Sequence, residues 1–379
     1  MIRLLVVDDS ALMRKLLGGI FGAEGDFEVR LARNGIEALE AVHAFAPHVV
    51  TLDIHMPEMD GLACLDRIML EKPCPVVMLS SLTEEGADAT LEAMRLGAVD
   101  VIAKPGGAVS LEIDRLAPRL VEKVRAAAGA RLRSSLRLRE RVRLRAAPSE
   151  LVRPLTPARA VARPVQAPAP EITPRDPGGF GLILIGTSTG GPPALETVLT
   201  ELPADLAWPV LVAQHMPASF TGALARRLNR ICALEVLEVT RPTRLAPGHV
   251  YIGRGDADLV VASRPGGLVA LPAPSHPDFL WHPSVDRLVA SALEHAGAPN
   301  LVGVLMTGMG HDGAKTMAQL RQDGGRTIAE SEESAVVWGM PGELVKAGGA
   351  DAVLPVDEIA GHILALVGRS HDAAFGRSS

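Results

Sequence analysis

Short apolar runs alternate with amphipathic segments twice along this chain, and this alternation constrains its fold more than any other feature. Between residue 2 and about residue 120, four apolar runs end in polar residues, at 4–9, 49–53, 75–81 and 99–105. The segments between them carry apolar residues at helical spacing, and the alternation resumes at residue 181. Alternating strands and helices predict parallel sheets covered by helices, with ligands at the carboxyl ends of the strands. We therefore expect two doubly wound α/β domains.

The stretch that joins these two regions has a different composition. Residues 115–175 hold 15 of the 38 Lys and Arg but only 4 of the 44 Asp and Glu, and eight prolines lie between Pro148 and Pro177. This composition is typical of an extended tether, although residues 131–145 also fit a solvated basic helix. We expect a first domain, a basic Pro-rich linker, a second domain and a frayed tail at 1–122, 123–179, 180–369 and 370–379.

Composition also excludes several classes of protein. Aromatic residues make up 3% of the chain, and both domains are acidic outside the linker, so we expect no nucleic-acid partner. The chain begins without a signal sequence and has no apolar run near 18 residues, which indicates a cytoplasmic protein that does not insert into a membrane. The chain has three cysteines, whose spacing fits neither a metal site nor a disulfide framework: Cys64, Cys74 and Cys232.

Carboxylates end two of the apolar runs in the first region. Asp8 and Asp9 follow the first run and Asp53 ends the second, so a parallel sheet brings them to one edge. Three carboxylates repel one another unless a cation lies among them, and Mg²⁺ prefers such oxygen ligands. Ser80 and Lys104 end two further runs and offer a hydroxyl and an ammonium to phosphate oxygens. The pattern predicts phosphorylation of Asp53, with solvated loop carboxylates as the alternative interpretation.

Four motifs in this region, DD at 8–9, LDIHMPEMDG at 52–61, SS at 80–81 and KP at 104–105, resemble the receiver domain of two-component response regulators. The resemblance implies a flavodoxin-like fold in which Asp53 accepts a phosphoryl group from a histidine kinase. It implies that Ser80 and Lys104 contact this group. It further implies a magnesium site made of the backbone carbonyl of His55 and the side chains of Asp8, Asp9 and Asp53. Receivers usually carry Tyr or Phe three residues before the lysine, where this chain has Val101.

A second set of strand-end residues lies in the second region. Ser188 follows an apolar run and precedes two glycines and a helix, which matches a G-x-S-x-G turn that exposes a nucleophile. The glycines do not form G-x-G-x-x-G, so a dinucleotide site is disfavoured. His215 ends the next run, and Asp312 follows a third one in a Gly-rich turn. A serine with a base and an orienting acid indicates acyl-transfer chemistry; His311 is a less favoured alternative base.

The motifs GTSTGG at 186–191, QHMP at 214–217, HPSVD at 282–286 and TGMGHDG at 307–313 resemble the catalytic domain of chemotaxis protein-glutamate methylesterases, the CheB family. The resemblance implies that Ser188 attacks the γ-methyl ester of a chemoreceptor glutamate, that His215 transfers the proton and that Asp312 orients His215. The backbone amides of Thr189 and Met309 are implied to form the oxyanion pocket. Ester hydrolysis needs no cofactor, and receptor glutamines are implied to be deamidated at the same site.

The resemblance further implies that the unphosphorylated receiver covers the catalytic face. Because the linker is long, we expect weaker inhibition than with a short linker. Its arginines fit contact with anionic membranes, docking to acidic parts of the protein, or a solvated spacer. Two other functions stay open: the same esterase in a pathway that controls an output other than motility, and a phosphorylated regulator with a non-catalytic binding output. Four methionines near the proposed site either form a pliable surface for a receptor helix or fill the core: Met216, Met306, Met309 and Met340.

Overall fold

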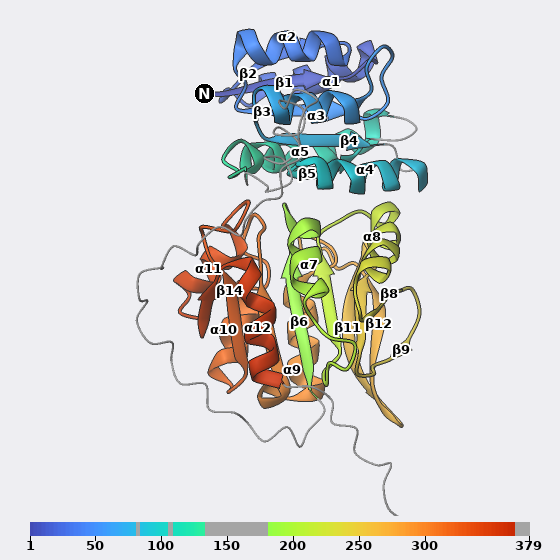
Figure 1. The fold of residues 1–379 in the computed structure, drawn as a ribbon, viewed down its shortest axis with the longest axis vertical. Helices are drawn as coiled ribbons and strands as arrows, with labels where there is room; N and C mark the ends of the chain where they lie inside the picture. The colour runs from blue at the N-terminus through green and yellow to red at the C-terminus, as the bar shows by residue number, and fades with distance from the viewer. Residues whose placement is uncertain (81–83, 105–108, 133–180, 368–379) are drawn as a thin grey trace, which may run out of the picture.

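The N-terminal domain is a five-stranded parallel sheet flanked by helices. The computed structural model describes residues 1–80, 84–104, 109–132 and 181–367 (Figure 1). The strand order is β2-β1-β3-β4-β5, the flavodoxin-like order that the resemblance to receiver domains implied. In chain order its elements are β1 (Ile2–Val7), α1 (Ala11–Ala23), β2 (Phe27–Ala32), α2 (Gly35–Phe45), β3 (Val49–Asp53), α3 (Gly61–Glu71), β4 (Val76–Ser80), α4 (Glu84–Leu96), β5 (Asp100–Ala103) and α5 (Val109–Ala128).

Local sequence explains where these elements begin. The residues of β3 and β4 are all buried, as expected for central parallel strands that helices cover on both faces. Ser10, Asn34 and Asp60 cap α1, α2 and α3, since each side chain accepts a hydrogen bond from a backbone N–H three residues later. Each helix therefore starts just beyond the carboxyl end of a strand, and the functional loops lie at that edge.

The C-terminal domain has a seven-stranded parallel sheet with the order β15-β14-β13-β6-β7-β10-β8 and a three-stranded antiparallel sheet β11-β12-β9. Strand β6 pairs with β7 on one side and with β13 on the other. Its elements are β6 (Leu182–Thr187), α7 (Gly191–Thr200), β7 (Val210–Gln214), α8 (Ala218–Ile231), β8 (Glu235–Val239), β9 (Thr243–Arg244), β10 (His249–Gly253), β11 (Ala257–Arg264), β12 (Gly267–Pro274), α9 (Val285–Ala296), η1 (Ala298–Asn300), β13 (Leu301–Leu305), α10 (Ala314–Gln322), β14 (Arg326–Glu330), α11 (Met340–Lys346), β15 (Ala352–Leu354) and α12 (Val356–Val367).

The direction of chain crossing reverses at β6. From β6 the chain first adds β7 on one side and later adds β13 on the other. Doubly wound sheets bind ligands outside the carboxyl end of the strand at such a reversal. This places the segment that begins at Ser188 at the most favourable position for a binding site.

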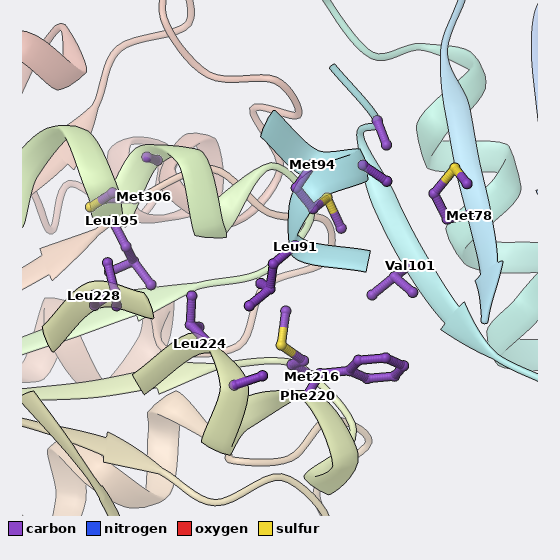
Figure 2. Packing of buried hydrophobic residues seen from close by; sticks show 14 of the residues in the cluster. Met78, Leu91, Met94, Val101, Leu195, Met216, Phe220, Leu224, Leu228 and Met306 are labelled. Atoms are coloured by element: carbon purple, nitrogen blue, oxygen red, sulfur yellow. The ribbon is translucent and has the colours of Figure 1, made fainter. Parts of the chain in front are cut away.

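The two domains share a packed interface. Helix α4 packs on α7 and α8 (Figure 1), and one buried cluster joins Leu91 and Met94 of the first domain to Met216 and Phe220 of the second (Figure 2). Val101, where receivers usually carry an aromatic residue, is buried in the same cluster. The α4–β5 side of the N-terminal domain therefore lies on the C-terminal domain.

The segment that follows α5 also contacts the second domain. Arg131 donates its backbone N–H to the carbonyl of Val336 at 2.9 Å and pairs with the carboxylate of Glu332 at 2.7 Å. Residues 133–180, which hold most of the predicted linker and its arginines, lie outside the described residues, and so does the predicted tail.

The four methionines near the strand ends belong to the core. Met216 and Met309 are 4% and 5% exposed, and Met306 and Met340 are fully buried. Their flexible side chains fill irregular gaps between the sheet and its helices. Met306 and Met340 therefore fill the core, whereas Met216 lies in the buried cluster that joins the two domains.

Candidate active site

Ser188, His215 and Asp312 come together at the carboxyl edge of the seven-stranded sheet. Ser188 follows β6, His215 follows β7, and Asp312 lies between β13 and α10. The backbone N–H of Ser188 donates to Thr307 at 2.9 Å, and that of His215 donates to Thr187 at 3.0 Å. The ladders of the sheet thus continue past its last residues and hold the three loops side by side.

The imidazole of His215 is oriented by Asp312. Its Nε2 lies 2.8 Å from Oδ2 of Asp312, and because a carboxylate only accepts, this nitrogen carries the proton. Its Nδ1 is buried and has no hydrogen-bond partner in the described part of the chain. A neutral imidazole bonded in this way has its lone pair on Nδ1. Nδ1 is therefore the nitrogen of His215 that can accept a proton.

Asp312 is surrounded by donors from the start of α9. Its carboxylate accepts hydrogen bonds from the hydroxyl of Ser284 at 3.1 Å and from the backbone N–H groups of Val285 and Asp286 at 2.7 and 3.0 Å. Burial acts to raise the pKa of Asp312, but the hydrogen bond and charge of His215 and these backbone donors outweigh it and hold the pKa below the usual value. Asp312 is therefore an anion at neutral pH.

Sequence reasoning missed these donors. The HPSVD motif was part of the family resemblance, but no role was predicted for Ser284 or Asp286. Ser284 caps α9 by accepting from the N–H of Arg287, and a serine before an amphipathic run is a detectable cap signal. The carboxyl of Asp286 accepts from the hydroxyl of Thr316 at 2.7 Å. Its pKa is raised by burial and by the charge of Asp312, while Thr316 opposes the rise.

The loops that carry Thr189 and Met309 lie next to Ser188. The hydroxyl of Thr307 donates to the carbonyl of Thr189 at 2.9 Å, which ties the two loops together. A Cβ at Gly308 would stand 2.7 Å from the Cβ of Ser188, so only glycine allows this approach. Thr189 and Met309, the two residues predicted to form the oxyanion pocket, directly follow Ser188 and Gly308 in the chain.

A tryptophan that the sequence did not single out lies on the catalytic histidine candidate. The ring centroids of Trp281 and His215 are 5.9 Å apart with planes inclined by 15°. Trp281 belongs to the loop between β12 and α9. No periodic pattern marks such a contact in the sequence, because it joins two loops that are 66 positions apart.

The N-terminal domain carries the predicted acidic site. Carboxylate oxygens of Asp8, Asp9 and Asp53 lie within 4.8 Å of one another. The ammonium of Lys104 lies 2.8 Å from both Asp8 and Asp53. Burial raises the pKa of Asp53, and the charge of Asp8 adds to the rise, while Lys104 lowers it. The single ammonium of Lys104 does not neutralise the three carboxylates. Their oxygens lie close enough together to bind Mg²⁺, which prefers such ligands.

The remaining predicted receiver residues surround Asp53. The backbone N–H of His55 donates to Oδ1 of Asp53 at 3.4 Å, which holds the following loop at the acidic cluster. Ser80 ends β4, is buried and donates its hydroxyl to the carbonyl of Gly86 at 3.1 Å. Ser80, Lys104 and Asp53 thus lie at the ends of three neighbouring strands, as the sequence predicted.

Comparison with known proteins decides the family. A family model described as CheB methylesterase matches residues 183–363, and one described as response regulator receiver domain matches residues 4–113. The protein-glutamate methylesterase/protein-glutamine glutaminase 2 of Rhodopseudomonas palustris is 61% identical over 367 residues, which are 96% of this chain and 98% of that protein. The chain belongs to the CheB methylesterase family.

A second relative agrees over almost its full length. The protein-glutamate methylesterase/protein-glutamine glutaminase 3 of Rhodospirillum rubrum is 52% identical and covers 99% of both chains. The solved CheB methylesterase catalytic domain of Thermotoga maritima covers 49% of this chain and 98% of that chain, with 35% identity and a TM-score of 0.48.

Family membership confirms the predicted combination of a receiver domain with a methylesterase domain, and with it an enzyme of the hydrolase class. A regulator with a non-catalytic output is not favoured. Among the helices that the structure describes, none is both long enough and apolar enough to cross a bilayer.

Proposed function

We propose that this protein hydrolyses glutamate γ-methyl esters on chemoreceptors to glutamate and methanol, and that phosphorylation of Asp53 activates it. The observation that carries the proposal is the hydrogen bond of 2.8 Å between His215 and Asp312, beside a serine at the reversal point of the sheet. A member of the CheB family with this arrangement holds a nucleophile, a base and an ionised acid at one edge.

The residues divide the reaction into two steps. His215 takes the hydroxyl proton of Ser188 at Nδ1 while Oγ attacks the ester carbonyl, and the backbone amides of Thr189 and Met309 donate to the oxyanion that forms. His215 then gives the proton to the leaving methanol. In the second step His215 removes a proton from water, which attacks the acyl-serine; His215 then returns this proton to Oγ of Ser188 as the ester bond breaks and glutamate is released. The anionic Asp312 stabilises the imidazolium in both steps.

The same steps deamidate glutamine. When the substrate is a receptor glutamine, the acyl-serine is identical, and the leaving group that His215 protonates is ammonia instead of methanol. No cofactor is needed in either reaction, since nucleophile, base and oxyanion donors all come from the chain.

The receiver uses its own residues to accept the phosphoryl group. The side chains of Asp8, Asp9 and Asp53 and the backbone carbonyl of His55 are the candidate magnesium ligands, with a histidine kinase as phosphodonor. Bound Mg²⁺ supplies positive charge for the carboxylates and the phosphoryl oxygens. In the unphosphorylated protein Lys104 pairs with Asp53 and Asp8. After phosphorylation, its ammonium pairs with an oxygen of the phosphoryl group instead.

The docked receiver explains why activation is needed. The backbone N–H of Gly190 donates to Val99 of the receiver at 2.9 Å, and the hydroxyl of Thr189 donates to the carboxylate of Asp100. Both contacts involve residues directly after the nucleophile. A protein substrate as large as a receptor helix has to displace this domain, so phosphorylation at Asp53 must weaken the docked state.

Methanol release from methylated receptor membranes tests the proposal. Wild type is compared with Ser188→Ala, each with and without a small-molecule phosphodonor and Mg²⁺. We expect release that the phosphodonor stimulates and that Ser188→Ala abolishes. Release that survives Ser188→Ala would remove the triad, and no release from wild type under either condition would reject the proposed substrate.

A further inference from the structure

Trp281 connects the catalytic histidine to the surface that the receiver covers. Its ring stacks on His215 at 5.9 Å, and its indole nitrogen lies 3.9 Å from the place where a Cβ on Gly310 would stand. Gly310 directly follows Met309, one of the proposed oxyanion residues. The ring therefore lies near both the proposed base and the loop of a proposed oxyanion donor. The proposed reaction assigns no role to it.

The cation that covers this ring comes from the other domain. The guanidinium carbon of Arg119, on α5 of the receiver, lies 5.8 Å from the centroid of Trp281. This distance is within the range in which a cation is attracted to an aromatic face. The side chain of Arg119 is otherwise exposed. When the receiver leaves, Trp281 loses this cation and its covered face becomes free.

A neighbouring aromatic residue shows that this arrangement is particular to Trp281. Phe279, two residues earlier in the same loop, also has a guanidinium over its ring, that of Arg287 at 5.9 Å. Arg287 belongs to the same domain as Phe279, so this pair persists when the domains separate. Of these two pairs, the one at Trp281 is broken when the domains separate.

We propose that Trp281 determines substrate specificity by binding a Lys or Arg side chain of the receptor, close to the methylated glutamate, at the face that Arg119 covers in the closed state. The inference rests on the proposed esterase function. Arg119 then acts as an internal stand-in for a receptor side chain, and the receiver competes with the receptor for one contact. The charge of the second domain agrees with a basic ligand, because residues 181–379 hold 20 Asp and Glu against 14 Lys and Arg.

Substitutions at the two residues have different expected effects. In the phosphodonor-activated enzyme, Trp281→Ala raises KM for the receptor by about 2- to 30-fold, the range of a cation–π contact. Trp281→Phe keeps a ring beside His215 and binds a cation less well, so it raises KM by a smaller factor and preserves kcat. Arg119→Ala raises the unstimulated rate and leaves the activated rate unchanged.

Arg125→Ala is the matched control for Arg119→Ala. Arg125 is also an α5 arginine over an aromatic ring, Phe27 at 5.3 Å, but both residues belong to the receiver. Its substitution should leave the unstimulated rate at the wild-type value. An equal rise in the two variants would show that loosening the receiver, and not uncovering Trp281, causes activation.

A double-mutant cycle across the complex decides the inference. Receptor membranes are prepared with each Lys or Arg within one helical turn of a methylated glutamate replaced by Gln. Binding is measured by cosedimentation in the Ser188→Ala background, with acetyl phosphate and Mg²⁺, so that the readout does not depend on hydrolysis. We expect one receptor substitution to weaken binding of the chain with Trp281 and to have no further effect with Trp281→Ala.

The outcomes separate this inference from the proposed function. Effects of the receptor and Trp281 substitutions that simply add would overturn the inference while methanol release by wild type still supports the esterase. An unchanged KM for Trp281→Ala would overturn it as well. Failure of wild type to release methanol would instead reject the proposed function, whatever the binding data show.

Discussion

Two aspartates, the buried Asp53 and the partly buried Asp312, each lie at the carboxyl edge of a parallel sheet, and their pKa values shift in opposite directions. Burial and the charge of Asp8 raise the pKa of Asp53, and Lys104 offsets them only in part. Burial acts on Asp312 in the same sense, but His215 and the backbone donors of α9 lower its pKa below the usual value. The number of donors around each carboxylate makes the difference. The donors around Asp312 keep it charged. Asp53 has fewer donors to offset its burial, as is suitable for a carboxylate that becomes phosphorylated.

The largest expected effect comes from removing the charge of Asp312. Asp312→Asn removes the charge that stabilises the imidazolium and allows the wrong tautomer of His215, so kcat for methanol release should fall by about 10³- to 10⁴-fold. Asp286→Asn is the control, because Asp312 accepts from the backbone of residue 286, and it should lose less than about 10-fold. Equal losses in both variants would mean that the local fold, and not the charge of Asp312, had been removed.

Thermal stability should separate the two aspartates by sign. Asp312, with a lowered folded pKa, stabilises the fold at pH values above its unfolded pKa of about 3.9, and this contribution is lost as the pH falls through the folded pKa. Asp312→Asn should therefore lower Tm at pH 7.5, with a cost of about 1 to 3 kcal/mol for the buried donors left without an anion.

Asp53 should show the reverse. Because its folded pKa is raised, its ionisation costs stability at neutral pH, and this cost disappears as the pH falls through the raised value. Asp53→Asn should raise Tm at pH 7.5 without Mg²⁺, and the gain should shrink towards pH 4. Circular dichroism melts of both variants check this pair; a decrease of Tm in Asp53→Asn would contradict the assigned compensation at the acidic cluster.

The smallest effect concerns the contact between the two regions. Asp100 accepts from Thr189 across the interface and from Lys123 within the receiver at 2.8 Å. Asp100→Asn weakens the link to Lys123 and to Thr189 while keeping the size of the side chain. The unstimulated rate of methanol release should rise by about 2- to 10-fold, the range for one net hydrogen bond. An unchanged rate would show that this bond does not hold the receiver in place.

The sequence predicted the site residues that parallel strands deliver. Ser188, His215 and Asp53 each end or follow an apolar run, and the carboxyl ends of parallel strands meet at one edge. The position of each residue at the end of an apolar run was therefore enough to predict where it lies in the sheet. The same pattern predicted a parallel, doubly wound sheet in the first domain, and the resemblance to receiver domains implied its flavodoxin-like order.

Contacts between distant loops left no such pattern. The donors at the start of α9 are separated from Asp312 along the chain by α9 itself, η1 and β13, and the stack of Trp281 on His215 joins two loops. The choice of Nε2 over Nδ1 for Asp312 depends on the orientation of the imidazole, which spacing along the chain does not contain. The burial of Val101 in the cluster that joins the two domains likewise depends on how the domains dock.

The central claim is that Asp53 controls an esterase whose nucleophile is Ser188. One preparation of methylated receptor membranes is treated with wild type and Asp53→Asn, each with and without acetyl phosphate and Mg²⁺, and the initial rate of methanol release is measured. The account predicts stimulation of wild type and an unstimulated rate in Asp53→Asn under both conditions. Equal stimulation of Asp53→Asn would contradict it.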